Sequence, residues 1–289
     1  MNIHSISYLF LITTLVIFIF SSCTTHKSGK LTNNNEDLKV ETYSASEKGF
    51  RSNSHLLLIG DSAVLVDAQF IPQDAENVVD LIHKSGKHLK AIIITHPHPD
   101  HYYGLEVIGK EFPGAMIYGG EETIGQIKNS SKYWEEKKGG IWTQDRFKIL
   151  DSGNFTVSGL DIQYKVFKNS ESIENMVLYI PSVKTLFIGD LASNNVHMWL
   201  TEGQSENWLV YLDQIKGIGP IDKVYPGHGP VSDQNIIDQA KEYINEVNMV
   251  IESSFSSEEA ILMIKEKYPD YEMPQILEGT VFGLFDTNK

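Results

Sequence analysis

The sequence feature that most limits what this chain can fold into is the heptapeptide Thr95–His101, which reads THPHPDH and ends a continuous apolar run. Such a run is typical of a strand that is covered on both faces. His96 and His98 alternate along the loop, so both can point at one metal ion. Asp100 and His101 are adjacent and can point at a second ion close by. Imidazole and carboxylate are suitable zinc ligands, and three of the chain's ten histidines lie here, so a chance gathering on a surface turn explains the motif poorly.

The balance of charged residues excludes some classes of partner. The 289 residues are 41% hydrophobic and 21% charged, which is ordinary globular composition. Lys and Arg number 24 against 38 Asp and Glu, a formal net charge of −14. This acidic excess repels nucleic acid and anionic membranes. We therefore expect no nucleic-acid partner, and nothing in the sequence indicates an obligate protein partner.

The N-terminus has the pattern of an export signal. Tyr8 to Phe20 is an apolar run of 13 residues, shorter than the roughly 20 residues that span a bilayer and suited to the core of a signal peptide. The small residues before Cys23 resemble those of a bacterial lipoprotein signal. We expect residues 1–22 to be a signal peptide, Cys23 the lipid acceptor and residues 23–37 a flexible tether. The expected protein is exported, a periplasmic or cell-surface lipoprotein that meets the membrane only through its lipid anchor.

Residues 38–289 are predicted to form one mixed α/β domain. A hairpin is predicted over His55–Ala68, with its turn at Gly60 and Asp61. Further β-rich runs occupy residues 91–96, 147–150, 155–157, 162–167, 176–180, 185–190 and 223–226. Helices are predicted over residues 72–86, 105–112, 121–138, 205–216 and 233–252. Residues 256–267 start with a capping signal and are predicted to be the last helix, while residues 139–146 are predicted to be a loop or lid.

The metal motif resembles that of the metallo-β-lactamase superfamily, His-x-His-x-Asp-His. The resemblance extends from about Val40 to His228, and the later motifs arrive in the family's order. They are LVDA with Asp67, the strand NMVLYIP at residues 175–181, the strand end Gly189-Asp190 and YPGHG at residues 225–229. The resemblance implies an αββα sandwich, in which two mixed β-sheets are flanked by helices.

The same resemblance implies two metal ions per chain, with zinc expected and manganese or iron tolerated. It assigns His96, His98 and Glu171 to the first ion. It assigns Asp100, His101 and His228 to the second ion, with Asp190 bridging the two. Glu171 stands where the family usually has histidine, as in members that resemble alkylsulfatases. Two alternatives to Glu171 as a ligand stay open. Glu174 could be the ligand instead, or Glu171 could be a solvated loop carboxylate that binds no metal.

The implied chemistry is hydrolysis of a small-molecule substrate, in which a metal-bound hydroxide attacks a cyclic amide or an ester. Asp100 would orient the hydroxide. His197 could reach the mouth of the site or be a loop histidine without a role. Alternatives are a lactonase, an esterase, a thioesterase, or a non-catalytic binding protein with a degenerate metal site.

The motif spacing is most similar to that of the class B1 β-lactamases, but three positions differ from the B1 pattern. Asp190 replaces a cysteine, His101 an arginine, and Ser193 the lysine that grips the β-lactam carboxylate. Without that cation, in an acidic protein, tight binding of penicillins is not expected. A neutral lactone or ester is a fair rival to a β-lactam.

Overall fold

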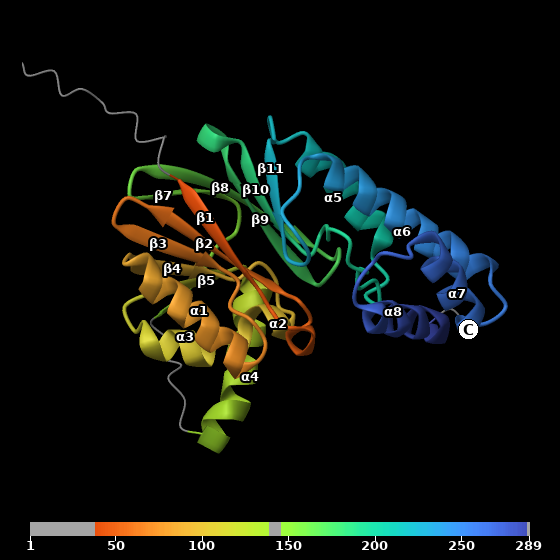
Figure 1. Ribbon diagram of the computed structural model, residues 1–289, viewed down its shortest axis with the longest axis horizontal. Coiled ribbons are helices and arrows are strands. Elements are labelled where there is room, and N and C mark those ends of the chain that lie inside the picture. Colours follow the sequence, from red (N-terminus) through yellow and green to blue (C-terminus); the bar gives the residue numbers. More distant parts are fainter. Residues whose placement is uncertain (1–37, 139–145, 288–289) are drawn as a thin grey trace, which may run out of the picture. The chain divides into compact units, whose positions relative to one another are not determined.

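The computed structural model describes residues 38–138 and 146–287. They form two mixed β-sheets with helices on their outer faces (Figure 1). In the first sheet the strand order is β1-β2-β3-β4-β5-β6, over Lys39–Ser44, Asn53–Ile59, Ser62–Val66, His88–Ile93, Met116–Gly119 and Phe147–Ile149. In the second the order is β11-β10-β9-β8-β7, over Lys223–Pro226, Thr185–Gly189, Glu174–Ile180, Leu160–Lys168 and Gly153–Val157. The predicted αββα sandwich is confirmed.

Both sheets contain parallel and antiparallel strand pairs. In the first sheet, β1, β2 and β3 pair antiparallel, and β3 to β6 pair parallel. In the second, β10 pairs parallel with β11 and antiparallel with β9, and β7 to β9 are antiparallel. The parallel strands β4, β10 and β11 are each followed by a loop that carries candidate ligands. β10 and β11 end side by side in the second sheet, and the ligands that follow them are grouped with those that follow β4 in the first.

The helices form the two outer layers. Those beside the first sheet are α1 (Pro72–Ser85), α3 (Leu105–Glu111) and α4 (Glu121–Lys138). Beside the second lie α5 (Ser205–Lys216) and α6 (Asn235–Ser253), and α7 (Ser257–Lys267) and α8 (Pro274–Thr287) pack on α6 and on each other. A short helix, α2 (Pro99–Tyr102), lies within the metal motif, and single 3₁₀ turns occupy Glu47–Gly49 and Pro181–Val183.

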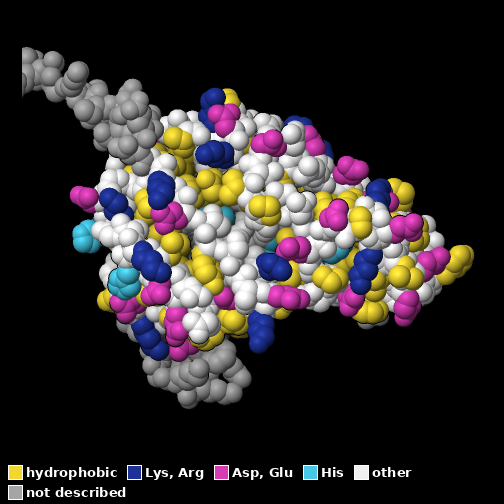
Figure 2. Space-filling view, viewed as in Figure 1, with side chains coloured by type: hydrophobic (Ala, Val, Ile, Leu, Met, Phe, Trp, Pro, Cys, Tyr) yellow, Lys and Arg dark blue, Asp and Glu magenta, His cyan; other side chains and the backbone are white. Residues whose placement is uncertain are grey.

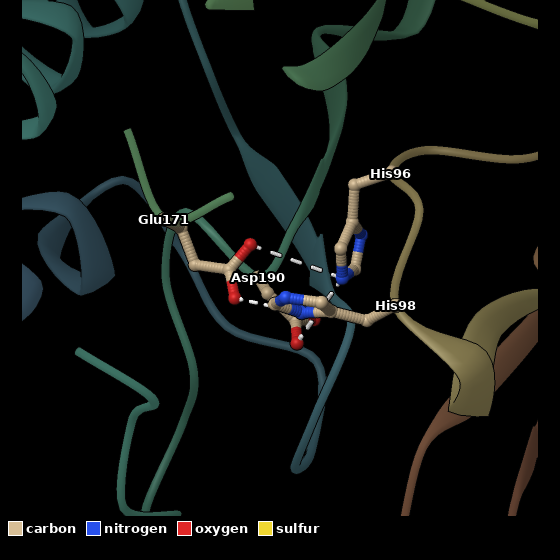
Figure 3. A group of neighbouring side chains, drawn as sticks. All are labelled: His96, His98, Glu171 and Asp190. Carbon is tan, nitrogen blue, oxygen red and sulfur yellow. Dashed lines mark ion pairs between the residues drawn. The ribbon is translucent and has the colours of Figure 1, made fainter. Parts of the chain in front are cut away.

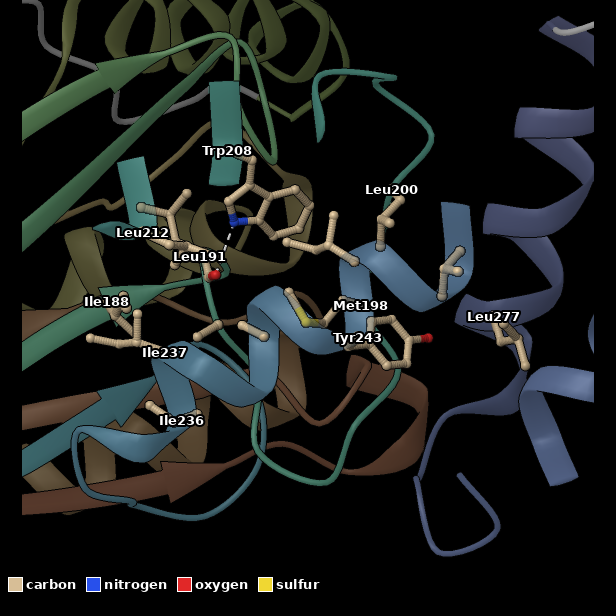
Figure 4. Packing of buried hydrophobic residues seen from close by; sticks show 14 of the residues in the cluster. Ile188, Leu191, Met198, Leu200, Trp208, Leu212, Ile236, Ile237, Tyr243 and Leu277 are labelled. Carbon is tan, nitrogen blue, oxygen red and sulfur yellow. Dashed lines mark hydrogen bonds between the residues drawn. The ribbon is translucent and has the colours of Figure 1, made fainter. Parts of the chain in front are cut away.

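Three hydrophobic cores follow from the two-residue period of the strands. In β2, Leu57 packs between the sheets, whereas Leu56 and Leu58 face the layer of α1, α3 and α4. The third core lies between the second sheet and α5 to α8, where the Trp208 indole is buried and donates a 2.9 Å hydrogen bond to the carbonyl of Leu191 (Figure 4). Burial on both sides makes the strands a rigid support for the loops at their ends.

The surface carries both signs of charge. On the face drawn in Figure 2, Lys and Arg are interspersed with Asp and Glu, and hydrophobic side chains lie between them. This face therefore offers no extended basic area.

Two sequence-based predictions were wrong. The 256–267 helix, observed as α7 with its Ser256 cap, is not the last, because α8 follows it. Two glycines obscured the helical signal of α8, and tertiary packing explains both. A Cβ at Gly279 would lie 2.6 Å from the Trp199 ring, and one at Gly283 would lie 2.7 Å from the Thr201 methyl. The second error concerns the metal motif, where the loop gives way to helix α2 at Pro99, because proline suits the first turn of a helix.

Several predictions fall outside the described residues. The predicted signal peptide, Cys23 and the predicted tether lie in residues 1–37. Of the loop or lid predicted over residues 139–146, only Arg146 is described. Within residues 38–138 and 146–287, no helix has the length and apolar character needed to cross a membrane.

Candidate metal centre

The candidate ligands come from four loops at one edge of the sandwich. The loop after β4 carries His96 and His98, and α2, which follows it, carries Asp100 and His101. Glu171 lies in the turn between β8 and β9. Asp190 follows β10, and His228 follows β11. All seven side chains predicted as ligands are brought together in two neighbouring groups.

The first group consists of His96, His98, Glu171 and Asp190 (Figure 3), whose ligand atoms lie within 4.8 Å of one another. His98 Nδ1 lies 3.0 Å from Glu171 Oε1. His96 Nε2 lies 3.8 Å from Glu171 Oε2 and 3.7 Å from Asp190 Oδ2. Two imidazoles and two carboxylates thus converge on one small volume.

The second group consists of Asp100, His101 and His228, again within 4.8 Å. The Nε2 atoms of His101 and His228 lie 3.4 and 3.3 Å from Asp100 Oδ2. They lie 3.4 and 3.1 Å from Asp190 Oδ2. Asp190 therefore touches both groups, which is the position that a bridging ligand requires.

Buried polar atoms without partners test whether metal ions fit these groups. Among the described residues, His96 Nε2, His101 Nε2, Glu171 Oε1 and Asp190 Oδ1 are buried and have no hydrogen-bond partner. Buried polar atoms are nearly always satisfied, so four such atoms on residues of these two groups indicate that the groups bind a further partner, such as a metal ion. The nitrogen and oxygen donors suit zinc, and the share of carboxylates also suits manganese or iron.

Hydrogen bonds at Nδ1 fix the orientation of three of the imidazoles. Nδ1 of His101 lies 2.9 Å from Asp67 Oδ2. Nδ1 of His228 lies 2.9 Å from the carbonyl oxygen of Phe50, and Nδ1 of His96 lies 2.9 Å from the Thr95 hydroxyl. With Nδ1 engaged in each ring, Nε2 faces the centre, and such outer contacts orient metal-binding imidazoles.

The electrostatics of the centre keep its carboxylates ionised. Burial alone would raise the pKa of the Asp190 carboxyl, but His101 and His228 beside it hold that pKa well below its usual range. For Asp100, burial is likewise outweighed, chiefly by His101. Burial lowers the pKa of His96, and the neighbouring His101 lowers it further. Ionised carboxylates and a neutral His96 are forms that bind a cation. The same carboxylates outweigh burial and raise the pKa of His101 and His228, which must each release a proton before they bind a metal ion.

Comparison with known proteins places the chain in a family. Residues 48–228 match the family model described as the metallo-beta-lactamase superfamily. The chain belongs to the metallo-β-lactamase superfamily. The resemblance stated from the sequence motifs is thereby confirmed.

Individual relatives are distant. The beta-lactamase-like protein 2 homolog of Caenorhabditis elegans is 25% identical over 201 residues, 67% of this chain and 60% of that protein. The hydroxyacylglutathione hydrolase of Glaesserella parasuis is 26% identical over 166 residues, 57% of this chain and 60% of that protein. The chain thus spans about 60% of the length of these curated relatives.

Solved structures support the same fold. DIM-1 metallo-beta-lactamase exposed to ceftazidime superposes with a TM-score of 0.57 at 22% identity, covering 75% of this chain and 94% of that one. The metallo-beta-lactamase from Pontibacter korlensis gives 0.55 at 21% identity, covering 72% and 99%. At these identities the likeness concerns the fold alone.

Glu171 and Glu174 have different surroundings within this superfamily fold. Glu171 points at His96 and His98, and its Oε2 accepts a 2.9 Å hydrogen bond from the Asn175 amide. Glu174 instead accepts hydrogen bonds from the backbone N–H groups of Glu122 and Thr123 at the start of α4. A carboxylate at this position suits the positive end of a helix. The geometry therefore favours Glu171 as the ligand.

A cavity of about 460 Å³ opens beside the centre, and His197 is one of its walls. Other lining residues are Phe50, Phe70, His98, Pro99, Asp100, Asp190, Ser193, Val196, Met198, Trp199, Glu202, His228 and Ile276. His197 thus lies in the wall of the cavity beside the metal centre. This is the position expected if its side chain reaches the mouth of the site. Its imidazole packs at 5.5 Å from the ring of Tyr271, and its Nδ1 lies 2.8 Å from the Tyr243 hydroxyl.

Sequence reasoning missed several residues that shape this centre. Glu202 Oε1 lies 3.8 Å from His98 Nε2 at the cavity wall, and the neighbouring His98 lowers the pKa of Glu202. Phe50 contributes a carbonyl oxygen, and Asn175 holds Glu171. Asn175 was recognised as part of a strand motif, so its spacing of four from Glu171 was an available signal. The other two carried no signal, because their contacts arise only in the folded chain.

Proposed function

We propose that this chain is a two-zinc hydrolase that cleaves an ester, a lactone or a cyclic amide in a small, uncharged substrate. The observation that carries the proposal is the pair of ligand groups that share Asp190 beside an open cavity. An enzyme of this kind needs both a charged centre and space for the substrate next to it.

Two divalent ions bound here would supply Lewis acidity, polarising the substrate carbonyl and lowering the pKa of a coordinated water. The residues of the chain provide the rest. Asp190 faces both groups and holds them in a fixed relation. Asp100 lines the cavity, and its ionised carboxylate can accept a hydrogen bond from the attacking water and orient it. The apolar walls exclude bulk water and so strengthen the local electrostatic interactions.

The charges of the cavity support an uncharged substrate. None of its described lining residues is Lys or Arg, and Ser193 and Glu202 stand in its wall. The three carboxylates Asp100, Glu171 and Asp190 also offset most of the charge that two divalent ions would bring. An anionic group would therefore meet no fixed cation on these walls. A neutral ester or lactone fits this surface better than a penicillin carboxylate.

A thioester is the second candidate substrate. It is favoured by relatives named hydroxyacylglutathione hydrolase, which match part of this chain. A β-lactam remains the candidate from motif spacing, and the missing cation in the cavity counts against it.

Metal content and turnover test the proposal together. We expect mass spectrometry to find two zinc ions per parent chain, and Glu171→Gln to lose at least one. Glu174→Gln is the matched control, because it changes a neighbouring buried carboxylate at the start of α4 and should keep both ions. The parent should hydrolyse neutral esters or lactones faster than benzylpenicillin, and a chelator should abolish turnover. If the parent binds no stoichiometric zinc even after zinc is added back, the hydrolase proposal fails and the chain is a non-catalytic binding protein.

We further propose that the chain is exported and anchored through a lipid on Cys23. The apolar run and the small residues before Cys23 support this proposal. Expressed in a bacterium, the parent should partition with membranes and Cys23→Ser should not. Equal partitioning of both proteins would overturn it.

A further inference from the structure

His197 is a polar side chain held inside a largely apolar wall. It is 3% exposed, and its backbone N–H donates a 3.1 Å hydrogen bond to the carbonyl of Glu272. Its neighbours along the chain, Val196 and Met198, also line the cavity. The backbone contact and the ring packing on Tyr271 fix this imidazole in place before any substrate arrives.

The hydrogen bond to Tyr243 sets which ring nitrogen carries the proton. The Tyr243 hydroxyl, which projects from α6 (Figure 4), lies 2.8 Å from His197 Nδ1. Tyr243 is 1% exposed, and among the described residues its hydroxyl has no other hydrogen-bond acceptor than this nitrogen. Because a buried hydroxyl hydrogen is rarely left without an acceptor, we assign the Tyr243 hydroxyl as the donor and Nδ1 as the acceptor. A neutral imidazole that accepts at Nδ1 carries its proton on Nε2.

The surroundings of the ring also keep it uncharged. Burial lowers the pKa of His197 to about 4, and the charge of Lys265 acts in the same direction. An imidazole of this kind neither gains nor loses a proton near neutral pH. It can donate one hydrogen bond, from Nε2, and among the described residues that nitrogen has no partner.

We propose that His197 is a substrate-binding residue, an Nε2–H donor locked in this tautomer by Tyr243, which binds an uncharged oxygen of the substrate. The acceptor would be a carbonyl, ester or ether oxygen on the part of the molecule that fills the cavity. A donor fixed in a largely apolar wall selects such a group, because a substrate lacking it would leave the donor unpaired. The inference rests on the proposed function, since the occupant of the cavity is taken to be its substrate.

The tautomer can be measured without any turnover. We would label the histidines of the zinc-loaded full chain with ¹⁵N and record long-range ¹H–¹⁵N spectra, with His197→Gln assigning the signal. The expected result is a neutral ring with the proton on Nε2 from pH 8 to pH 5.5. Tyr243→Phe should convert this signal to a mixture of tautomers. A proton on Nδ1, or titration of His197 near pH 6.5, would overturn the proposal.

Kinetics then test the role in binding. His197→Gln retains an N–H donor, and His197→Leu removes it while keeping an apolar side chain. With 4-nitrophenyl butyrate we expect KM to stay within about threefold in His197→Gln and to rise about tenfold in His197→Leu, with kcat changed less. The acid limb of the pH–rate profile should not move, because His197 transfers no proton. Equal KM values in the two variants, with zinc content and melting temperature matched, would overturn the assignment.

A failure of the proposed function is distinguishable from a failure of this inference. If the parent binds two zinc ions but hydrolyses no compound, the proposed function fails. The inference then predicts that an excess of γ-nonalactone shifts the His197 Nε2–H signal in the parent. The signals of histidines remote from the cavity should not shift. No shift at saturating lactone would overturn it.

Discussion

Asp67 Oδ2 lies 2.9 Å from Nδ1 of His101, and the same carboxylate accepts hydrogen bonds from the backbone N–H and the hydroxyl of Thr95. One buried carboxylate therefore connects the end of β3 to both halves of the metal motif. It orients His101 directly, and it holds Thr95, whose hydroxyl contacts the His96 ring.

Asp67→Asn tests this connection. Asp67 has a φ of 62°, and asparagine tolerates that left-handed conformation well, so the variant changes the charge with little backbone strain. We expect the zinc affinity to fall about 10- to 100-fold, the range found when outer contacts of metal ligands are lost. A competition titration against a chromogenic chelator measures it. Asp74→Asn, at another buried carboxylate that instead accepts from Tyr43, should leave the affinity unchanged; a similar fall in both would point to general destabilisation.

Gly227→Ala should damage the centre through Asp190. A Cβ at Gly227 would lie 1.9 Å from Asp190 Oδ1 and 3.1 Å from the carbonyl carbon of Gly189, so the bridging carboxylate must move. We expect loss of at least one zinc ion and a decrease in the free energy of unfolding of about 1–3 kcal/mol. Gly125→Ala in α4 is the control, because a Cβ there meets nothing within 4 Å and should stabilise the helix by about 0.5–1 kcal/mol. Full zinc content in Gly227→Ala would contradict this prediction.

Asn175→Asp should weaken the first metal group selectively. The amide of Asn175 donates to Glu171 Oε2 at 2.9 Å, and its carbonyl oxygen accepts from Ser170 and Ser172. An aspartate keeps the shape but places a second carboxylate against Glu171. We expect mass spectrometry of the native protein to show one zinc ion instead of two. Two tightly held ions in the variant would mean that Glu171 does not need its amide partner.

His55 should make the fold sensitive to acid. Its Nε2 lies 3.0 Å from the carbonyl oxygen of Pro226 and its Nδ1 lies 2.9 Å from the Thr42 hydroxyl, so the ring is buried in its neutral form. Burial lowers the pKa of His55 to about 4, whereas an unfolded histidine titrates near 6.5. The unfolded chain therefore binds the proton first, and the stability present above pH 6.5 is lost as the pH falls towards 4.

The measurement is urea unfolding of metal-free protein at pH 7 and pH 5. The parent should lose about 2 kcal/mol more than His55→Gln between these values, because the glutamine does not titrate. Parallel losses in the two proteins would show that other groups control the acid sensitivity. Removal of metal beforehand keeps protonation of the ligands from dominating the comparison.

Much of the centre could be predicted from the sequence because its ligands follow strands. The motif at residues 95–101, the acid after β10 and the histidine after β11 each sit at a strand end, and the sandwich brings such ends together. The choice between Glu171 and Glu174 could not be made in this way. It depends on where α4 begins, since the backbone N–H groups at that helix start engage Glu174. That contact joins residues more than 50 positions apart.

The cavity was less predictable than the ligands. Its wall includes Phe50, from a turn before β2, and Ile276, from a helix that the sequence pattern did not reveal. Periodicity failed for α8 because its two glycines serve contacts with Trp199 and Thr201 instead of an amphipathic stripe. Those contacts exist only once α8 is packed against residues 198–201.

Helix α8 contributes to the cavity although it lies outside the part of the chain that matches the family. The family match ends at residue 228, and α8 begins at Pro274, yet α8 supplies Ile276 to the cavity. Its Thr280 hydroxyl also accepts a hydrogen bond from the amide of Leu200 and donates one to the carbonyl of Met198. One part of the cavity wall is thus encoded outside the stretch that carries the metal ligands. Substitutions in the last stretch can retune which molecules enter while the strand-end ligands stay untouched, so directed evolution of new preferences should begin at α8.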